Sequence, residues 1–271
     1  MDRGYVLHSY PYRETSLILQ AFTEKHGRLG LVAKGARRPK SAARAVLVPF
    51  QPLVMDWFGK AELKTLKTAE PAVAATPLGG ESLMSAFYMN ELLLKLTTRD
   101  DPHEGLFEAY DEAITQLRAL SRTKAVKDKP AAAPQDRGTS PIEPILRRFE
   151  LRLLQELGYA LELTRESPGG AAIVAEREYF YVVERGPMPV PQGAETPFNA
   201  VRLRGHTLFD LERGRFENAT TVAQAKQLMR LLINHSLNGQ ELSTRALVRD
   251  LARMESEPSP RPSPKGEGEP P

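Results

Sequence analysis

The stretch VLHSYPYRETSLILQAFTEKHGRLGLVAKGARRPKS (residues 6–41) decides the fold of the N-terminal part of the chain. Runs rich in β-branched, leucine and aromatic residues alternate in it with clusters of Pro, Gly and charged residues, as strands alternate with turns. The connection at 24–27 ends in Gly27, which readily adopts the positive φ of a hairpin turn. We therefore predict that strands at 15–23 and 28–36 form an antiparallel pair.

Three further runs complete a predicted set of five strands, namely VLHSY (6–10), LVPFQPLVMDWF (47–58) and ELKTLKTAEP (62–71). Five short strands within about 80 residues fit an OB-type barrel, which hides its sheet edges by near closure. Residues 1–78 are thus predicted to form one barrel domain.

After residue 78 the apolar residues recur with helical spacing, which predicts helices at 81–99, 103–120, 142–157, 220–239 and 243–254. Ser243 is expected to cap the last of these helices. Residues 172–186 are read as a short strand pair or an irregular extended segment. The predicted fold class is therefore α+β, with an OB-type five-stranded barrel followed by an all-helical C-terminal domain at 79–254.

Two segments are predicted to be disordered because they lack the apolar residues needed for a core. The insertion SRTKAVKDKPAAAPQDRGTSP (121–141) contains three Pro and a single large aliphatic residue, Val126. The tail ESEPSPRPSPKGEGEPP (255–271) contains six Pro and no hydrophobic residue.

Composition argues against most enzyme and metal chemistry. The 271 residues include no Cys, which excludes disulfides, Cys-ligated zinc and thiol nucleophiles and fits a reducing compartment. The five His show no metal-ligand spacing, and GARRPKS (35–41) fails as a phosphate-binding loop because Pro39 donates no amide. No signal peptide or membrane span is evident. We expect a cytoplasmic protein that is not an enzyme and needs no cofactor or metal.

The net charge of +3 conceals a strongly basic N-terminal domain. Residues 1–78 carry 12 Lys and Arg against 6 Asp and Glu, whereas the rest of the chain carries 25 against 28. Within 25–44 lie seven basic residues and no acidic one. Such a run attracts polyanions by counterion release, although a solvated face or flexible loop would look the same in sequence.

Aromatic residues accompany the basic run and could stack on nucleobases. Tyr10 and Tyr12 are expected in the first connection between strands, on a shared face. Trp57 and Phe58 stand at a strand end, where one of the two is expected to pack into the core because neighbouring strand residues face opposite sides.

The same residues carry a family resemblance. Residues 6–41, followed by LVPFQPL and ELKTLKTAE, resemble the N-terminal OB domain of the bacterial recombination mediator RecO. YMNELLLKL (88–96), ILRRFELRLLQELGYALEL (145–163) and QAKQLMRLLINHSLNGQELSTRALVRDL (224–251) resemble its helical domain in the same order. Many members carry a four-cysteine zinc module where this chain reads TRESPGG (164–170). The chain thus resembles the zinc-free branch, and we expect packing alone to hold this loop.

The resemblance implies a DNA-repair mediator associated with the nucleoid. It would bind single- and double-stranded DNA, anneal complementary strands, and act with RecR to load RecA on DNA coated by the single-strand-binding protein SSB. The expected DNA contacts are Tyr12, Arg28, Lys34, Arg37, Arg38, Lys40 and Arg44. In the resembling family the LRRFEL segment lines the pocket for the acidic SSB tail, which points to Arg147 first, then Arg148 and Arg152, although three arginines on a helix can also be a solvated face.

Two other classes of function compete with this reading. An RNA- or ribosome-binding module is compatible with a basic OB barrel, because no residue in the sequence shows whether the protein recognises the 2′-hydroxyl that distinguishes RNA from DNA. An enzyme acting on nucleic acid is disfavoured by the lack of a carboxylate–metal constellation.

Overall fold

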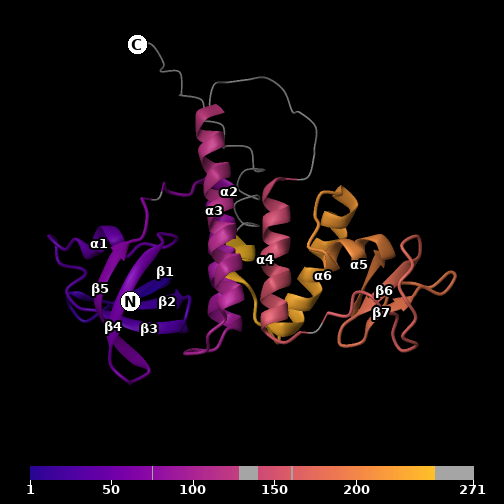
Figure 1. Cartoon of the computed structure of the whole chain (residues 1–271), viewed down its shortest axis with the longest axis horizontal. Helices are drawn as coiled ribbons and strands as arrows, with labels where there is room; N and C mark the ends of the chain where they lie inside the picture. The colour runs from indigo at the N-terminus through magenta and orange to yellow at the C-terminus, as the bar shows by residue number, and fades with distance from the viewer. Residues whose placement is uncertain (75, 128–139, 160, 248–271) are drawn as a thin grey trace, which may run out of the picture.

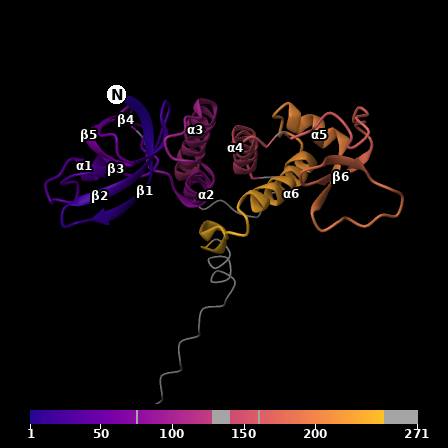
Figure 2. The same cartoon turned by 90° about the horizontal axis from the view of Figure 1, so that it is seen from below.

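The computed structural model describes residues 1–74, 76–127, 140–159 and 161–247. A β-barrel lies at one end of the elongated molecule, a layer of long helices occupies the middle, and a small sheet lies at the other end (Figure 1). The view from below in Figure 2 shows the same order. The predicted barrel followed by a helical region is confirmed.

Five strands close the barrel in the order β1-β2-β3-β5-β4. Their bounds are β1 (Asp2–Tyr12), β2 (Ser16–Thr23), β3 (Gly27–Ala33), β4 (Leu53–Phe58) and β5 (Leu63–Pro71). The predicted hairpin is confirmed, since β2 and β3 pair antiparallel and Gly27 has a φ of 64°. A side chain there would also collide with the Asp101 backbone. The strand predicted at 47–58 is too long, because the short helix α1 (Ala43–Val46) and a turn precede Leu53.

The barrel is filled by residues that alternate along each strand, including Val6, Leu19, Leu31, Leu53 and Met55, all of them fully buried. Part of its outer face packs against the helices. There Tyr5 and Phe22 meet Phe107 and Tyr110 of the helix α3 (Glu104–Lys127), and the ring centres of Tyr5 and Tyr110 lie 5.1 Å apart in an edge-to-face contact. The outer face of the barrel and the helices therefore share one apolar cluster, which is separate from the cluster inside the barrel.

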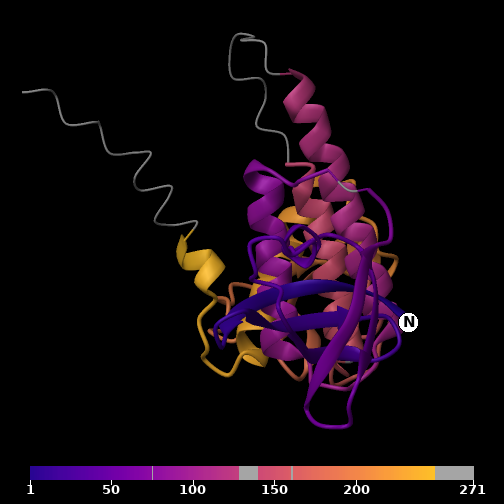
Figure 3. The same cartoon turned by 90° about the vertical axis from the view of Figure 1, so that its left-hand side faces the viewer.

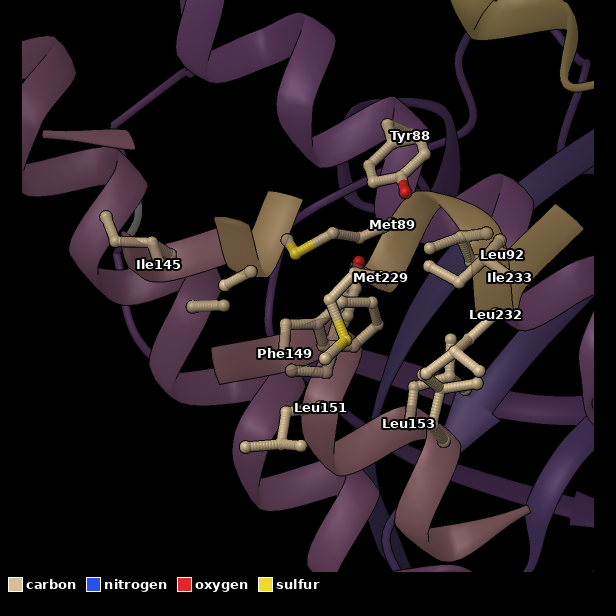
Figure 4. Close-up of a cluster of buried hydrophobic side chains, with 14 of the residues drawn as sticks. Tyr88, Met89, Leu92, Ile145, Phe149, Leu151, Leu153, Met229, Leu232 and Ile233 are labelled. Atoms are coloured by element: carbon tan, nitrogen blue, oxygen red, sulfur yellow. The ribbon is translucent and has the colours of Figure 1, made fainter. Parts of the chain in front are cut away.

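The long helices are α2 (Gly80–Leu96), α3 (Glu104–Lys127), α4 (Ile142–Glu156) and α6 (Ala219–Ser236). Their bounds agree with the predicted spans to within three residues, except that α3 extends seven residues further than the predicted 103–120. Figure 4 shows their common core, in which Met89 and Leu92 of α2, Phe149 and Leu153 of α4, and Met229, Leu232 and Ile233 of α6 converge. Residues 243–247 are helical, and the rest of the helix predicted at 243–254 lies outside the described residues.

The first seven residues of the segment predicted to be a disordered insertion are helical. Residues 121–127 continue α3, because a helix already packed at 104–120 gains one hydrogen bond for each added residue and the first Pro comes only at 130. Residues 128–139 and the tail 255–271 lie outside the described residues.

The C-terminal region is not helical throughout. It contains a three-stranded sheet in the order β7-β6-β8, formed by β6 (Glu178–Val182), β7 (Gly186–Pro189) and β8 (Ala200–Arg204), and followed by α5 (Gly205–Glu212). The strand pair considered for 172–186 thus exists as the β6–β7 hairpin, shifted toward the C-terminus. Tyr179 and Tyr181 face the main core, whereas Phe180 packs in a separate cluster. Because both faces are covered, the polar alternation that marks a strand is missing.

The loop at 164–170 is held by hydrogen bonds. The Glu162 carboxylate accepts bonds of 2.9 Å from the backbone N–H groups of Thr164 and Arg165, and one of 2.8 Å from the Thr164 hydroxyl. The Tyr179 hydroxyl donates to Glu166 and accepts from the Val174 amide. The expectation that packing alone holds the loop is therefore wrong.

Candidate DNA and peptide interfaces

The basic loop that joins β3 to α1 is built as a series of turns. Gly35 adopts a φ of 68°, and the Arg38 amide closes the first turn on the Gly35 carbonyl at 3.1 Å. The Arg37 amide donates to the Thr15 carbonyl at 2.9 Å, which fastens the loop to the turn between β1 and β2. The loop therefore presents its side chains from a fixed backbone.

The cations of this loop have no carboxylate partner among the described residues. Lys34, Arg37, Arg38, Lys40 and Arg44 are all exposed, and none forms an ion pair with any residue in the described ranges. The Arg37 guanidinium donates long hydrogen bonds to the backbone carbonyls of Arg13 and Glu14. Together with Arg13 we call these residues the basic loop. Its charges do not neutralise one another or any described carboxylate.

Arg13 was missed by the sequence analysis. It lies in the β1–β2 turn with a φ of 51°, and it joins the cluster because Arg37 bonds to that turn. The sequence placed Arg13 in the connection between the strands predicted at 6–10 and 15–23, but it gave no sign that this connection lies beside the loop at 34–40, because the approach of the two turns depends on strand pairing.

Arg28 differs from the other predicted DNA contacts. Its guanidinium donates to the Thr97 carbonyl at 2.7 and 3.2 Å and to Gln20 at 3.3 Å. Burial, together with the neighbouring Arg99 guanidinium, lowers the pKa of Arg28. The side chain joins β3 to the end of α2 and is not a free cation, so we remove it from the candidate DNA contacts.

The aromatic residues are arranged differently from the prediction. Tyr10 and Tyr12 belong to β1 and not to a connection, because β1 extends to residue 12. Tyr12 is half-buried with the Arg13 guanidinium 5.2 Å from its ring centre, whereas Tyr10 is 49% exposed. Phe58 is 58% exposed and Trp57 packs against the barrel core, which confirms that one of the two faces inward.

A second candidate site is a cavity of about 630 Å³ between α2, α4, α6 and the segment 239–245. Its wall combines apolar and cationic side chains, including Met84, Leu146, Leu242, Lys226, Arg230 and Arg245. Such a mixture suits a short peptide that carries both acidic and apolar groups.

The floor of this cavity is a buried charged network. Arg147, 5% exposed, donates to Glu150 at 2.8 Å and lies 3.5 Å from Glu143. The Tyr88 hydroxyl donates to the same Glu150 oxygen at 2.7 Å. Burial raises the pKa of Glu150 even though Arg147 opposes the shift. One nitrogen of Arg147 (Nε) and one oxygen of each glutamate remain buried without a hydrogen-bond partner.

The structure brings only one of the three predicted peptide-binding arginines into the cavity. Arg148 lies 5.7 Å from the Phe216 ring and 3.8 Å from Glu217, and Arg152 pairs with Glu156 at 2.8 Å. Successive helix residues diverge by about 100°, so Arg147 and Arg148 cannot face one site. We remove Arg148 and Arg152 from the candidate peptide site.

Three cavity-lining cations were missed by the sequence analysis. Lys226 and Arg230 lie one turn apart on the exposed side of α6, a spacing that could have suggested a shared face. Arg245 extends over the Tyr88 ring at 5.5 Å and donates to Asn234 at 2.8 Å. No sequence signal connects Arg245 to this place, because the path of the chain after α6 is set by tertiary contacts.

The helix that carries Arg245 is capped by a residue from another helix. The Glu91 carboxylate of α2 accepts from the amides of Ser243 and Thr244 at 2.7 and 2.9 Å, and from the Thr244 hydroxyl. Burial opposes ionisation, but the bonds from Thr244 and Ser243 outweigh it and lower the pKa of Glu91. The cap expected from the Ser243 side chain is therefore supplied by Glu91.

Two further properties concern the described part of the chain. No helix in it is long and apolar enough to cross a bilayer. No group of three or more His, Cys, Asp or Glu side chains in the same residues could hold a metal ion.

Comparison with known proteins identifies the family. The family described as "Recombination protein O N terminal" matches residues 1–74, and "Recombination protein O C terminal" matches 79–127 and 136–246. The chain is 45% identical over 251 residues to the DNA repair protein RecO of Azoarcus sp., covering 93% of this chain and 96% of that protein. The chain is 44% identical to the DNA repair protein RecO of Aromatoleum aromaticum, and the match covers 93% of this chain and 95% of that protein. The chain belongs to the RecO family of DNA repair proteins.

Proposed function

We propose that the protein is a recombination mediator that binds single- and double-stranded DNA and anneals complementary strands. With RecR it helps to load RecA onto DNA coated by SSB. It acts by binding and not by catalytic turnover, in the cytoplasm at the nucleoid. The observation that carries the proposal is the basic loop, whose exposed cations have no ion-pair partner among the described residues.

The basic loop is proposed to contact DNA phosphates. Arg13 comes from the β1–β2 turn, and Lys34, Arg37, Arg38 and Lys40 come from the loop that the Arg37–Thr15 hydrogen bond joins to that turn. Arg44 follows in α1. Clustered, unpaired cations release condensed counterions when they bind a nucleic-acid backbone, and this contribution is independent of sequence. Annealing of any complementary pair requires such contacts, because the Watson–Crick edges must stay free.

The cavity between α2, α4 and α6 is proposed to hold the acidic, apolar-ended tail of SSB. Apolar wall residues such as Met84, Leu146 and Leu242 suit the apolar end of that peptide, and Arg230 is an exposed cation on the same wall. Arg147 is already paired with two carboxylates. Its proposed role is to offset the charge of Glu143 and Glu150 so that an anionic peptide can approach.

The test of this function is strand annealing on SSB-coated DNA, measured with and without RecR. We expect the protein to anneal complementary strands under SSB and RecR to allow RecA loading. Competition between matched DNA and RNA strands separates this function from an RNA-binding role. Preference for RNA, or no annealing on SSB-coated DNA, would contradict the proposal.

A further inference from the structure

Two cations on the rim of the cavity between α2, α4 and α6 are not neutralised by any described carboxylate. Arg230 of α6 is exposed and forms no ion pair with a residue in the described ranges. Arg245 donates to two neutral groups, Asn234 at 2.8 Å and the Tyr88 hydroxyl at 3.3 Å. Asn234 lies one turn after Arg230 on α6, so the two guanidiniums occupy the same part of the rim.

The other charged side chains of the lining leave this rim net positive. Lys226 and Arg147 both contact Glu143. Arg147 also donates to Glu150, so these two cations and two carboxylates balance. The remaining carboxylate of the lining is Glu241, whose side chain forms no ion pair with a described residue. Two unpaired guanidiniums thus stand against one unpaired carboxylate, which favours an anionic ligand.

The described part of the chain stops beside this cavity. Arg245 lines the cavity, and Leu247 is the last described residue, with 49% of its surface exposed. Figures 2 and 3 show the short helix at 243–247, in yellow, projecting from one side of the helical layer. The sequence continues through 248–271, whereas the family match ends at residue 246. A segment outside the shared domains therefore starts next to the cavity.

The sequence of this segment fits the cavity in charge and in the order of its residues. In GEGEPP (266–271), Glu267 and Glu269 stand two residues apart and are followed by Pro270 and Pro271. Residues two apart in an extended chain are separated by about 6.6 Å, similar to the rise of about 5.4 Å for one helical turn. Two carboxylates at this spacing suit the two guanidiniums, and the proline rings suit the apolar part of the wall.

The chain between Leu247 and Glu267 is long enough to return to the cavity. The predicted helix at 248–254 would extend it by about 10 Å, and residues 255–266 can span up to about 37 Å at about 3.1 Å per residue. A tether of this length gives the segment 266–271 an effective concentration on the order of 1 mM at the cavity. Even a weak contact is then substantially populated.

We propose that residues 266–271 occupy this cavity and compete there with the SSB tail. The inference rests on the proposed peptide site and adds its regulation by a segment of the same chain. Glu267 and Glu269 bind the guanidiniums of Arg230 and Arg245, and the prolines lie against the apolar wall. Because the two ligands exclude each other, only the fraction of molecules with an empty cavity binds the SSB tail, and the apparent Kd rises by the reciprocal of that fraction.

The first experiment measures the affinity of each protein for a labelled SSB-tail peptide by fluorescence anisotropy. A chain truncated after Met254 and the full-length double variant Glu267→Gln, Glu269→Gln should both bind about 2- to 5-fold more tightly than the wild type. The double variant Glu255→Gln, Glu257→Gln removes the same charge from the same segment and should bind as the wild type does. An equal gain in this control would overturn the assignment to residues 266–271.

A disulfide test detects the contact without SSB. The chain has no Cys, so Gly268→Cys combined with Ser85→Cys, in the cavity lining, permits a single disulfide. Gly268→Cys with Phe87→Cys is the matched control, because Phe87 is exposed on the same helix but packs on Phe50 outside this cavity. Under mild oxidation we expect the first pair to react about 10-fold faster, because docking raises the local thiol concentration. Arg230→Ala should remove that difference.

The two proposals fail in different ways. If the SSB-tail peptide binds the wild type and the truncated chain equally, and the two cysteine pairs react at the same rate, the competition is wrong and the peptide site stands. If no form of the protein binds the SSB-tail peptide but the cavity pair still reacts faster in an Arg230-dependent way, the SSB site is wrong. The cavity would then bind the chain's own segment alone, and the proposed competition with SSB would be overturned with the site.

Discussion

The Tyr88 hydroxyl of α2 and the Glu150 carboxylate of α4 share a buried hydrogen bond of 2.7 Å. Arg147 donates to the same carboxylate oxygen from one turn earlier on α4. This arrangement places a charged network under a cavity whose upper wall carries Arg230 and Arg245. Mutation of Arg147 in the buried network should therefore change protein stability, whereas mutation of the exposed Arg230 in the wall should not.

Arg147→Ala should reduce stability and peptide binding together. The change leaves Glu143 and Glu150 close to each other without their buried cation, and breaking a buried pair in this way costs about 3–5 kcal/mol. Arg230→Ala removes an exposed cation and should leave the melting temperature unchanged. Both variants should bind an SSB-tail peptide about 5- to 30-fold more weakly, the order expected for a lost charge contact. Calorimetry measures the change in stability, and fluorescence anisotropy with a labelled peptide measures the change in peptide affinity.

Naked-DNA binding is the control for both of these variants, because the cavity is formed by elements other than the barrel strands. Unchanged tail affinity in Arg230→Ala would remove that residue from the peptide site. Unchanged stability in Arg147→Ala would contradict the role given to the buried network.

Glu91→Gln should destabilise the protein in a pH-dependent way. The folded-state pKa of Glu91 lies below its ordinary value of 4.5, so its stabilising contribution is complete above that pH and is lost as the pH falls through the lower folded pKa. At pH 7 the change should cost about 1–2 kcal/mol, as for loss of a helix cap. Between pH 5 and pH 3 the difference from the wild type should shrink, as measured by urea unfolding.

A suitable control for this measurement is Glu108→Gln, which alters an exposed carboxylate of α3. It should leave the pH dependence of stability as in the wild type. A constant difference between Glu91→Gln and the wild type from pH 7 to pH 3 would show that the carboxylate charge does not supply the cap.

Replacing Arg37, Arg38 and Lys40 together by Ala should weaken DNA binding equally for unrelated sequences. Each lost phosphate contact should lower the magnitude of the slope of log K against log salt by about 0.7 for single strands, so the triple variant should lose about 2. Arg122→Ala removes one exposed cation from α3, outside the basic loop, and should leave the slope unchanged. An unaltered slope in the triple variant would leave the basic loop as a solvated surface.

Metal chelation should have no effect on folding, because hydrogen bonds to Glu162 hold the loop at 164–170. These bonds, led by that from the Thr164 amide, lower the pKa of Glu162. Glu162→Ala should therefore increase amide hydrogen exchange at Thr164 and Arg165, while EDTA leaves the melting temperature of the wild type unchanged. Stoichiometric zinc that is lost together with stability on EDTA treatment would contradict this prediction.

Sequence reasoning located most of the elements because local pattern determines them. The hairpin at Gly27 and the helical spacing of α4 and α6 are visible in short stretches of sequence. Sequence reasoning failed where tertiary packing, and not the local pattern of apolar residues, determines the secondary structure. The strand β6 lies between two apolar clusters and therefore lacks polar alternation. The helix α3 extends into a segment whose composition suggested disorder.

The sequence by itself determined that a basic, cysteine-free barrel precedes a mainly helical region, because charge, composition and hydrophobic periodicity are properties of the chain. Only the tertiary structure decided which cations are free. Arg28 and Lys34 are equally basic in sequence, but Arg28 bonds to Thr97, 69 residues away, whereas Lys34 remains exposed. Arg147 and Arg148 likewise separate into a buried and an exposed residue. The reason is that a partner distant in the chain, and not the residue type, determines whether a charge is satisfied within the fold.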